Sequence, residues 1–393
     1  MKKQVLFILS ALFVTTVLIT SCHKPSSEDL IEQSSEPVLP AIADNYKASS
    51  NDQLAALGRV LFYDKKLSLN NTISCASCHQ QEKAFCDNQK VSTGLEDFKT
   101  KRNSPSIFAR EGRLFWDGRV NDFEELSLKP IKNHVEMKFE NINELAKKIS
   151  TINYYPNLFK KAFGTTQIDS LKIQSALAEF LINFNFSENR FRHSELKKAK
   201  LTASEEIGKT VFFGKGRCSN CHHIQDNGIL PNDFGSGYGF TDQSFNIGLD
   251  EVYSDNGLGE ITGNPADYGK FMIPVLLNVE YTAPYMHDGR FSTLEEVVEH
   301  YNSGIKNHPN LDMSLRGDFD FDRMSSEMIM IKFDVNGNGI LDESEIQNIT
   351  SSLQPVRLNL DENEKRCLVA FLKSLSDPTI LSDQKFSNPF ARK

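Results

Sequence analysis

The sequence lacks an excess of positive charge: 44 Lys and Arg residues stand against 52 Asp and Glu residues, a formal net charge of −8. Nucleic-acid-binding domains usually carry a basic patch, so this balance argues against a nucleic-acid partner. Segments that alternate between polar and apolar residues are scarce, which argues against a fold made of strands. The length of 393 residues is enough for two or three domains with their own cores.

The sequence begins with the pattern of an exported protein. The apolar run over residues 5–19 follows two lysines and is too short for a comfortable membrane span. Thr20, Ser21 and Cys22 follow the run, as in a bacterial lipoprotein, so we predict a signal peptide over residues 1–21 and lipidation of Cys22. Residues 22–50, rich in Ser, Glu and Pro, are expected to form a flexible tether. We therefore expect a periplasm-facing protein attached to a bacterial membrane, the outer one, only through its lipid; a plain signal peptide is the alternative.

Four of the seven cysteines form two copies of one motif, Cys75-Ala76-Ser77-Cys78-His79 and Cys218-Ser219-Asn220-Cys221-His222. Cys-x-x-Cys-His is the attachment signal for c-type haem. Thiols at this spacing can form thioethers with the two haem vinyl groups, and the following His can then bind the iron. A zinc or redox site is the alternative, but zinc-binding pairs usually lie closer together. Cys86 and Cys367 remain, either as a disulfide or as small buried residues.

Similar helical segments precede the two motifs. Apolar residues recur at helical spacing over residues 54–63 and 205–213, and Gly58-x-x-Leu-Phe in the first segment corresponds to Gly208-x-x-Val-Phe in the second. We therefore predict a mainly α protein with two cytochrome c-like domains, each with one covalent haem, and a connector near residues 189–200. Further helices are expected over residues 142–149, 170–184, 293–301 and 363–375.

Further motifs resemble, in the same order, those of the dihaem cytochrome c peroxidase and MauG family. The resemblance runs from about Leu54 to Ser376. It implies a peroxide-reacting haem domain over residues 51–195 and an electron-transfer haem domain over residues 196–380. It also implies hydrogen peroxide as oxidant, a small cytochrome or another periplasmic carrier as electron donor, and, by analogy, a homodimer. The motifs are Arg102-Asn103-Ser104-Pro105-Ser106, Phe115-Trp116-Asp117-Gly118-Arg119, Asn133-His134-Val135-Glu136-Met137 and Ala283-Pro284-Tyr285-Met286-His287-Asp288-Gly289.

The resemblance also assigns roles to single residues. Glu136 matches the family's distal acid, which moves a proton between the two oxygens of bound peroxide. Trp116, the single tryptophan, matches the one between the two haems; packing in the core is the alternative. Asn103, Thr282 and Pro284 match positions that hold a calcium ion near the domain interface.

The sequence departs from the family pattern around both haems. Many members block the first haem with a His that would fall before Trp116, and none lies between it and His79, so we expect an open first haem. His134 is the alternative ligand. Leu126 replaces a Gln that the family often carries, which removes a polar group near this haem.

For the second haem, the expected distal ligand is Tyr301. It stands fourteen residues after His287, where ordinary members carry Met and MauG carries Tyr. A phenolate favours higher oxidation states of iron, whereas Met favours the ferrous state. Core packing of this tyrosine is the alternative, and His300, Met272 and Met286 are other candidate ligands.

An insertion over residues 318–352 contains a segment that fits the EF-hand calcium loop at every diagnostic position. Gly339 stands at the sixth position, where the loop turns sharply. Because only one such loop is present, we expect a structural calcium site rather than a sensor. The predicted ligands are Asp334, Asn336, Asn338, the backbone of Ile340, Asp342 and Glu345.

Three functions follow from these residues. The first is a peroxidase that reduces hydrogen peroxide to water, and Glu136 with an open first haem favours it. The second is a MauG-like oxidase, in which peroxide-generated high-valent haem oxidises a protein or organic substrate, and Tyr301 favours it. The third is a non-enzymatic dihaem electron carrier, against which Glu136 argues.

Overall fold

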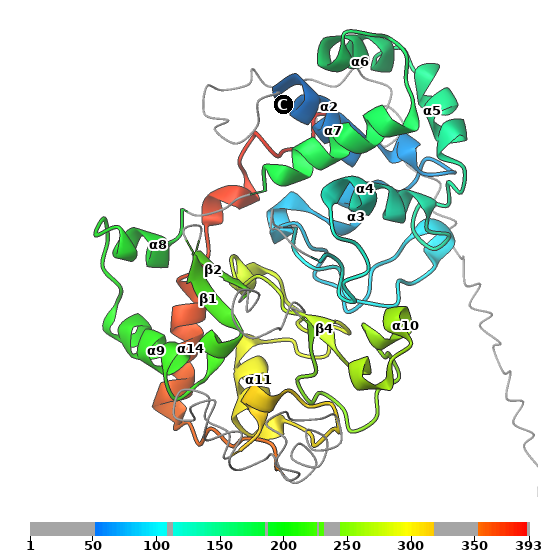
Figure 1. Ribbon diagram of the computed structural model, residues 1–393. Helices are drawn as coiled ribbons and strands as arrows, with labels where there is room; N and C mark the ends of the chain where they lie inside the picture. Colours follow the sequence, from blue (N-terminus) through cyan, green and yellow to red (C-terminus); the bar gives the residue numbers. More distant parts are fainter. Residues whose placement is uncertain are drawn as a thin grey trace, which may run out of the picture.

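The computed structural model describes residues 52–107, 113–184, 188–225, 228–231, 244–317 and 353–390. Within these ranges it is mainly helical, as predicted, and Figure 1 shows two bodies of helices, one above the other. No helix of the described part is long and apolar enough to cross a membrane. The predicted lipidation site Cys22 and the predicted calcium loop 334–345 lie outside the described residues.

The upper body in Figure 1 contains α2 (Asp52–Tyr63), α3 (Cys75–Cys78), α4 (Phe123–Lys132), α5 (Ile142–Ser150), α6 (Tyr155–Phe163) and α7 (Ser170–Ile182). The lower body contains α8 (Arg190–Glu195), α9 (Ala203–Phe213), α10 (Gly259–Thr262), α11 (Leu294–Glu299) and α14 (Glu362–Lys373). It also has two antiparallel strand pairs. In the first pair His222 of β1 (His222–Gln225) lies opposite Pro231 of β2 (Gly228–Pro231). In the second pair Ser244 of β3 (Ser244–Phe245) lies opposite Met272 of β4 (Phe271–Met272).

The core of the upper body forms where α2 crosses α7. Phe62 of α2 is buried, and its ring meets that of Phe180 on α7 edge to face, with 5.3 Å between the centroids. Aromatic pairs of this geometry stabilise a core beyond the burial of their area. Asp169 begins α7 by accepting a hydrogen bond from the backbone of Lys172, which satisfies a free N–H group of the first turn.

The core of the lower body repeats this arrangement with α9 and α14. Phe212 of α9 meets Phe371 of α14 edge to face, again with 5.3 Å between the centroids. Thr202 and Glu205 form a capping box that begins α9, and Asp361 and Glu364 form one that begins α14. The sequence thus sets the ends of both helices locally, and their crossing buries the apolar faces.

Gly58 and Gly208 occupy equivalent places at the two crossings. A Cβ atom on Gly58 would stand 1.9 Å from the Ala176 carbonyl oxygen on α7, and one on Gly208 would stand 1.9 Å from the Cys367 carbonyl oxygen on α14. Only glycine allows the helices to approach so closely. This match supports the predicted duplication. Cys367 therefore has a packing role, and both it and Cys86 are buried free thiols rather than a disulfide.

Two segments pack in ways that two fully separate domains would not explain. Part of the expected connector forms α8, and its Phe191 is buried against Phe371 of the lower core, with 5.3 Å between ring centroids. After α14 the chain leaves the lower body and returns to α2 of the upper one (Figure 1). Phe386 and Phe390 of this returning segment are part of the upper core.

Candidate active site

The first Cys-x-x-Cys-His motif forms a single helical turn, α3. Ser74 precedes the turn and Ser77 closes a capping box with it, so the turn begins at Cys75. The backbone N–H of His79 donates to the Cys75 carbonyl at 3.0 Å. Burial raises the pKa of the Cys75 thiol to about 12 and that of Cys78 to about 11, and both thiols are free. The two thiols and the histidine thus meet in the arrangement that the motif predicts.

Two groups lie within hydrogen-bond distance of His79 Nδ1: the Phe85 carbonyl, which is the nearer, and the Ser104 hydroxyl at 3.4 Å. The His79 Nδ1–H donates to the Phe85 carbonyl over 2.8 Å, which leaves Nε2 as the nitrogen that can bind a metal. Burial lowers the pKa of His79, which favours the neutral ring that metal ligation requires. A second-shell carbonyl of this kind makes the coordinating nitrogen more basic. The residues of this motif therefore fit a covalent haem with His79 as proximal ligand.

Glu136 lies on the loop after α4, and its carboxyl is held by Asn133. The Asn133 Nδ2 donates to Glu136 Oε1 over 2.8 Å, and the Asn133 carbonyl accepts from the backbone of Glu136 and Met137. Burial raises the pKa of Glu136, while Arg119 and the Asn133 hydrogen bond lower it in part. The negative charge of Glu136 also contributes to the raised pKa of Cys75, so the acid lies within electrostatic range of the first haem motif.

His134 and Leu126 lie on the same part of the chain. His134 is exposed to solvent, two residues from the partly buried Glu136. Leu126, in α4, is partly buried against the upper core. The sequence analysis gave Asn133 no role beyond its place in a motif. The hydrogen bond from Asn133 to Glu136 is a contact that residue spacing alone did not indicate.

Tyr301 lies in an unusual turn beside the second haem motif. We expected a helix to Tyr301, but α11 ends at Glu299 and residues His300–Gly304 form a π-helical turn. Such turns are rare and often occur at functional sites. Burial raises the pKa of the Tyr301 phenol well above its usual range, and the Cys221 and Cys218 thiols add to the effect. The structure thus brings Tyr301 close to the two thiols of the second motif.

The second motif itself is less regular than the first. Cys218–Asn220 form a 3₁₀ turn, and β1 begins at His222. Burial raises the pKa of both thiols, to about 12 for Cys218.

Two of the alternative ligands for the second haem have other partners. The His300 Nε2–H donates to the Ile247 carbonyl over 3.0 Å, and burial lowers the pKa of this ring to about 4. The Met272 sulfur accepts from the Ser244 hydroxyl over 3.0 Å. Met286, the third alternative, is partly buried against the cluster of Leu249, Tyr253 and Phe271.

Trp116 joins the two bodies. Its indole Nε1–H donates to the Asn103 carbonyl over 2.9 Å, and its own carbonyl accepts from the Met272 backbone over 2.8 Å. The ring packs against the lower-body cluster of Leu249, Tyr253 and Phe271. Trp116 therefore contacts both halves of the molecule.

The predicted interdomain calcium ligands lie on neighbouring segments of the same interface. The Asn103 Nδ2 donates to the Gln89 carbonyl over 2.8 Å. The adjacent Asn88 donates from its Nδ2 to the Tyr281 and Ala283 carbonyls, which flank Thr282. Asn88 thus ties the segment that contacts Asn103 to the loop of Thr282 and Pro284. No cluster of three or more His, Cys, Asp or Glu side chains suited to a metal occurs among the described residues.

An ion-pair network that the sequence did not indicate crosses this interface. Arg102 of the upper body donates to both carboxylate oxygens of Asp255 in the lower body, each over 2.8 Å, and also pairs with Asp117. The guanidinium lowers the pKa of the Asp255 carboxyl well below its usual range. Arg102 stood in a predicted motif, but Asp255 lies 153 residues away and had no recognisable signal.

Comparisons with known proteins agree with this geometry. A family model described as "Di-haem cytochrome c peroxidase" matches residues 52–200. Cytochrome c551 peroxidase of Nitrosomonas europaea is 34% identical over 272 residues, covering 67% of this chain and 76% of that protein. Methylamine utilization protein MauG of Paracoccus denitrificans is 28% identical over 369 residues, covering 84% of this chain and 89% of that protein.

A solved structure extends the likeness over most of the chain. The crystal structure of a MauG-like protein associated with microbial copper homeostasis aligns with a TM-score of 0.68 at 30% identity, covering 91% of this chain and 97% of that one. The dihaem family implies two c-type haems, for which the chain supplies two Cys-x-x-Cys-His motifs. On sequence and on structure, the chain belongs to the dihaem cytochrome c peroxidase family, together with MauG.

Proposed function

We propose that the protein reduces hydrogen peroxide to water with two electrons from a small cytochrome or another periplasmic donor. The observation that carries the proposal is the setting of Glu136, whose carboxyl is partly buried, held by Asn133 and close to Cys75. An electron carrier without peroxide chemistry has no use for such an acid. The exposed position of His134 supports an open first haem, because this was the alternative blocking ligand.

In this proposal Glu136 moves a proton. The haem at the first motif supplies the iron at which peroxide binds and through which electrons arrive. Peroxide must lose a proton from its inner oxygen and gain one on its outer oxygen before the O–O bond breaks. The Glu136 carboxylate takes the first proton and returns it to the departing oxygen. Burial raises the pKa of this group, which makes its acid form easier to reach than that of an exposed Glu.

Trp116 is the residue we propose to lie on the electron route from the second haem domain, residues 196–380, to the first, residues 51–195. Its ring packs on the lower body and its indole N–H donates to the upper one. The Arg102–Asp255 pair beside it holds the same interface. Each molecule of hydrogen peroxide then consumes two electrons and two protons and yields two molecules of water.

The deciding experiment is one equivalent of hydrogen peroxide added to the fully ferric, calcium-loaded holoprotein, followed by stopped-flow absorption. We expect the spectrum of the first haem to change rapidly, and turnover to follow when a reduced small cytochrome is added. A reaction that begins only after the second haem is reduced would show that the first haem is blocked. No reaction in either state would contradict the proposal and leave an electron carrier.

A MauG-like oxidase is the second candidate, and the position of Tyr301 favours it. This phenol lies in a π-helical turn close to Cys218 and Cys221, where an anionic ligand would stabilise oxidised iron. The same centres would then withdraw two electrons from a protein or organic substrate. Rapid reaction with peroxide but no turnover with any small cytochrome would favour this candidate.

We also propose that the protein is exported and anchored through lipidated Cys22, and that residues 334–345 bind calcium. The apolar run over residues 5–19 and the EF-hand pattern support these two proposals. Mass spectrometry of the mature protein would test the first, because a lipidated N-terminal cysteine has a characteristic added mass.

A further inference from the structure

The orientation of His79 depends on a strained turn. The acceptor for its Nδ1–H is the Phe85 carbonyl, at 2.8 Å. Ala84 and Phe85 adopt φ angles of 53° and 60°, in the left-handed region that residues with a Cβ atom rarely enter. Two such residues in succession persist only where surrounding contacts hold them. The position of this carbonyl therefore depends on what packs around Phe85.

The returning C-terminal segment, residues 378–390, supplies part of that packing. The ring of Phe386 lies 6.2 Å from the Phe85 ring and 5.0 Å from the Phe184 ring, which in turn lies 4.5 Å from Phe85. Phe386 is only 3% exposed and Phe85 is fully buried. Removal of Phe386 would thus leave space directly beside the residue whose carbonyl orients His79.

Hydrogen bonds hold the same turn to the same segment. Gln81, four residues before Phe85, donates from its Nε2 to the Ile380 carbonyl over 2.9 Å and to the Asp383 carbonyl over 2.7 Å. Both acceptors are backbone groups of the C-terminal segment. The turn that carries the His79 acceptor is therefore held at Gln81 by polar contacts and at Phe85 by an aromatic one.

The C-terminal segment is itself fixed at both ends. On the lower body, Asp377 donates its backbone N–H to Asn278 Oδ1 over 2.7 Å. On the upper body, the Tyr63 hydroxyl donates to the Phe386 carbonyl over 2.5 Å, and Arg59 Nε donates to the Ser387 carbonyl over 2.6 Å.

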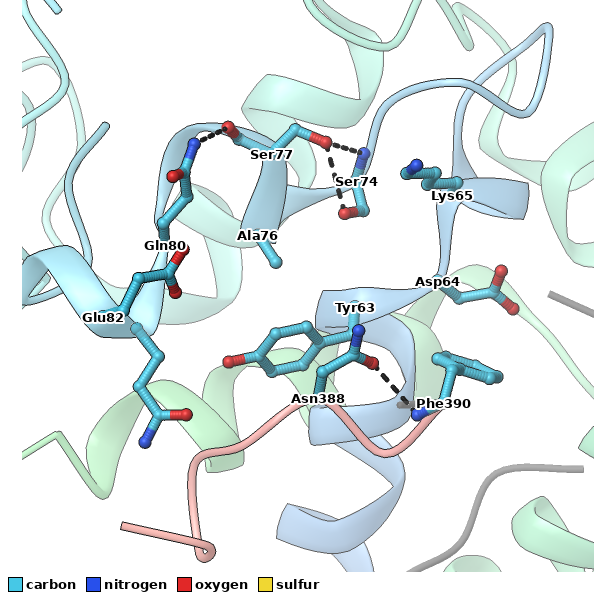
Figure 2. Close-up of a pocket in the computed structure, with 11 residues that line it drawn as sticks. Tyr63, Asp64, Lys65, Ser74, Ala76, Ser77, Gln80, Glu82, Asn388 and Phe390 are labelled. Carbon is cyan, nitrogen blue, oxygen red and sulfur yellow. Dashed lines mark hydrogen bonds between the residues drawn. The ribbon is translucent and has the colours of Figure 1, made fainter. Parts of the chain in front are cut away.

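The same segment closes one side of a cavity of about 360 Å³ next to the first haem motif. Figure 2 shows Asn388 and Phe390 on the C-terminal segment, across this cavity from Ser74 and Ser77 of the haem-motif turn. The end of the segment thus lies across this cavity from the turn that carries the first haem motif.

We propose that the C-terminal segment is a positioning element for the proximal ligand of the first haem, and that it acts on His79 through Phe386, Gln81 and the Phe85 carbonyl. The proposal rests on the proposed function in one respect, that His79 binds the iron of the peroxide-reacting haem. A firm hydrogen bond to Nδ1–H makes the ligating nitrogen more basic, which favours ferric iron. Because the segment starts at the end of α14, it also connects this ligand to the core of the lower body.

The test compares three variants of the holoprotein by spectroelectrochemical titration of both haems, with ferric EPR spectra of each. Phe386→Ala removes the aromatic contact, and Gln81→Met removes the two hydrogen bonds while keeping the side-chain length. Phe159→Ala is the matched control: it removes a fully buried phenylalanine from the same upper core, but one whose ring pairs with Tyr155 and Phe163 of α6, at 6.2 Å and 5.9 Å.

We expect the midpoint potential of the first haem to rise in both test variants, while the second haem and the control keep wild-type values. A tenfold loss in the relative stabilisation of ferric iron corresponds to a rise of about 59 mV. If Phe386→Ala does not accumulate, Phe386→Leu keeps an apolar core and tests the same contact. Unchanged midpoint potentials in both Phe386→Ala and Gln81→Met, or an equal rise in Phe159→Ala, would overturn the proposal. The potentials can be read whether or not peroxide is reduced, so loss of the proposed peroxidase function would be recognised separately.

Discussion

Replacement of Glu136 by Gln gives the sharpest test of the proposed proton transfer. The amide keeps the size of the side chain but cannot take a proton from peroxide. Positioned acid–base groups contribute about 10²–10⁴-fold to a rate, or about 3–5 kcal/mol of activation free energy. We therefore expect the second-order rate constant for reaction with peroxide, measured by stopped flow, to fall by a factor in this range. The exposed Glu140, four residues further along the same loop, provides the control as Glu140→Gln.

The pH dependence of the same rate separates proton transfer from a structural effect. Glu136 acts as a base, so the rate should decrease as the pH falls through its pKa, which burial raises above that of a free Glu. The Asn133 hydrogen bond stabilises the carboxylate, and such bonds to charged groups contribute about 1.5–3 kcal/mol. Its removal in Asn133→Leu should raise the pKa further and move the decrease to higher pH. In Glu136→Gln the decrease should vanish.

Two results would refute this reasoning. The first is a Glu136→Gln variant that reacts within a few-fold of the wild-type rate, since a proton shuttle cannot be lost at so small a cost. The second is an Asn133→Leu variant that reacts more slowly at every pH with an unchanged profile. That outcome would reduce Asn133 to a residue that shapes the loop, without effect on the protonation of Glu136.

Three further predictions follow from other parts of the molecule. Gly208→Ala should lower the free energy of unfolding by about 1–3 kcal/mol, seen as a lower Tm, because its Cβ would stand 1.9 Å from the Cys367 carbonyl oxygen. Gly317→Ala should leave the Tm unchanged, because the nearest described atom to its Cβ would be the Gln354 carbonyl oxygen at 3.4 Å. Tyr301→Met should raise the midpoint potential of the second haem, because a thioether favours ferrous iron, and unchanged potentials and spectra would show that Tyr301 only packs. Chelation of calcium with EGTA should lower the Tm, and Glu345→Gln should remove this calcium dependence; a Tm indifferent to EGTA in the wild type would contradict the calcium loop.

Local features of the structure were predictable because their signals are local. The haem-motif turn at Cys75 and the two short motifs that contain Gly58 and Gly208 each involve residues only a few positions apart. Each of these patterns restricts the backbone directly, through a hydrogen bond of the first turn or the absence of a Cβ atom. Their prediction needed no knowledge of the tertiary fold.

Contacts between distant segments were not predictable from one sequence. Arg102 and Asp255 are separated by 153 residues, and Gln81 and Ile380 by 299. Nothing in the residues themselves selects these partners among many other charged or amide groups. The π-helical turn at Tyr301 was missed for a related reason, since apolar spacing predicts a helix but cannot distinguish an ordinary turn from a widened one.

The duplication explains why the two halves share a core and yet differ in chemistry. The two helix crossings, at Gly58 and at Gly208, are alike, and in each a pair of phenylalanine rings meets edge to face with 5.3 Å between the centroids. The chemical groups lie outside these crossings, with Glu136 on the loop after α4 and Tyr301 on the turn after α11. A change in such a segment alters the setting of one haem without loss of the packed core. A partly buried acid near one motif and a phenol near the other are thus compatible with a single repeated scaffold, and the proposed difference in function between the two haems can arise from loops alone.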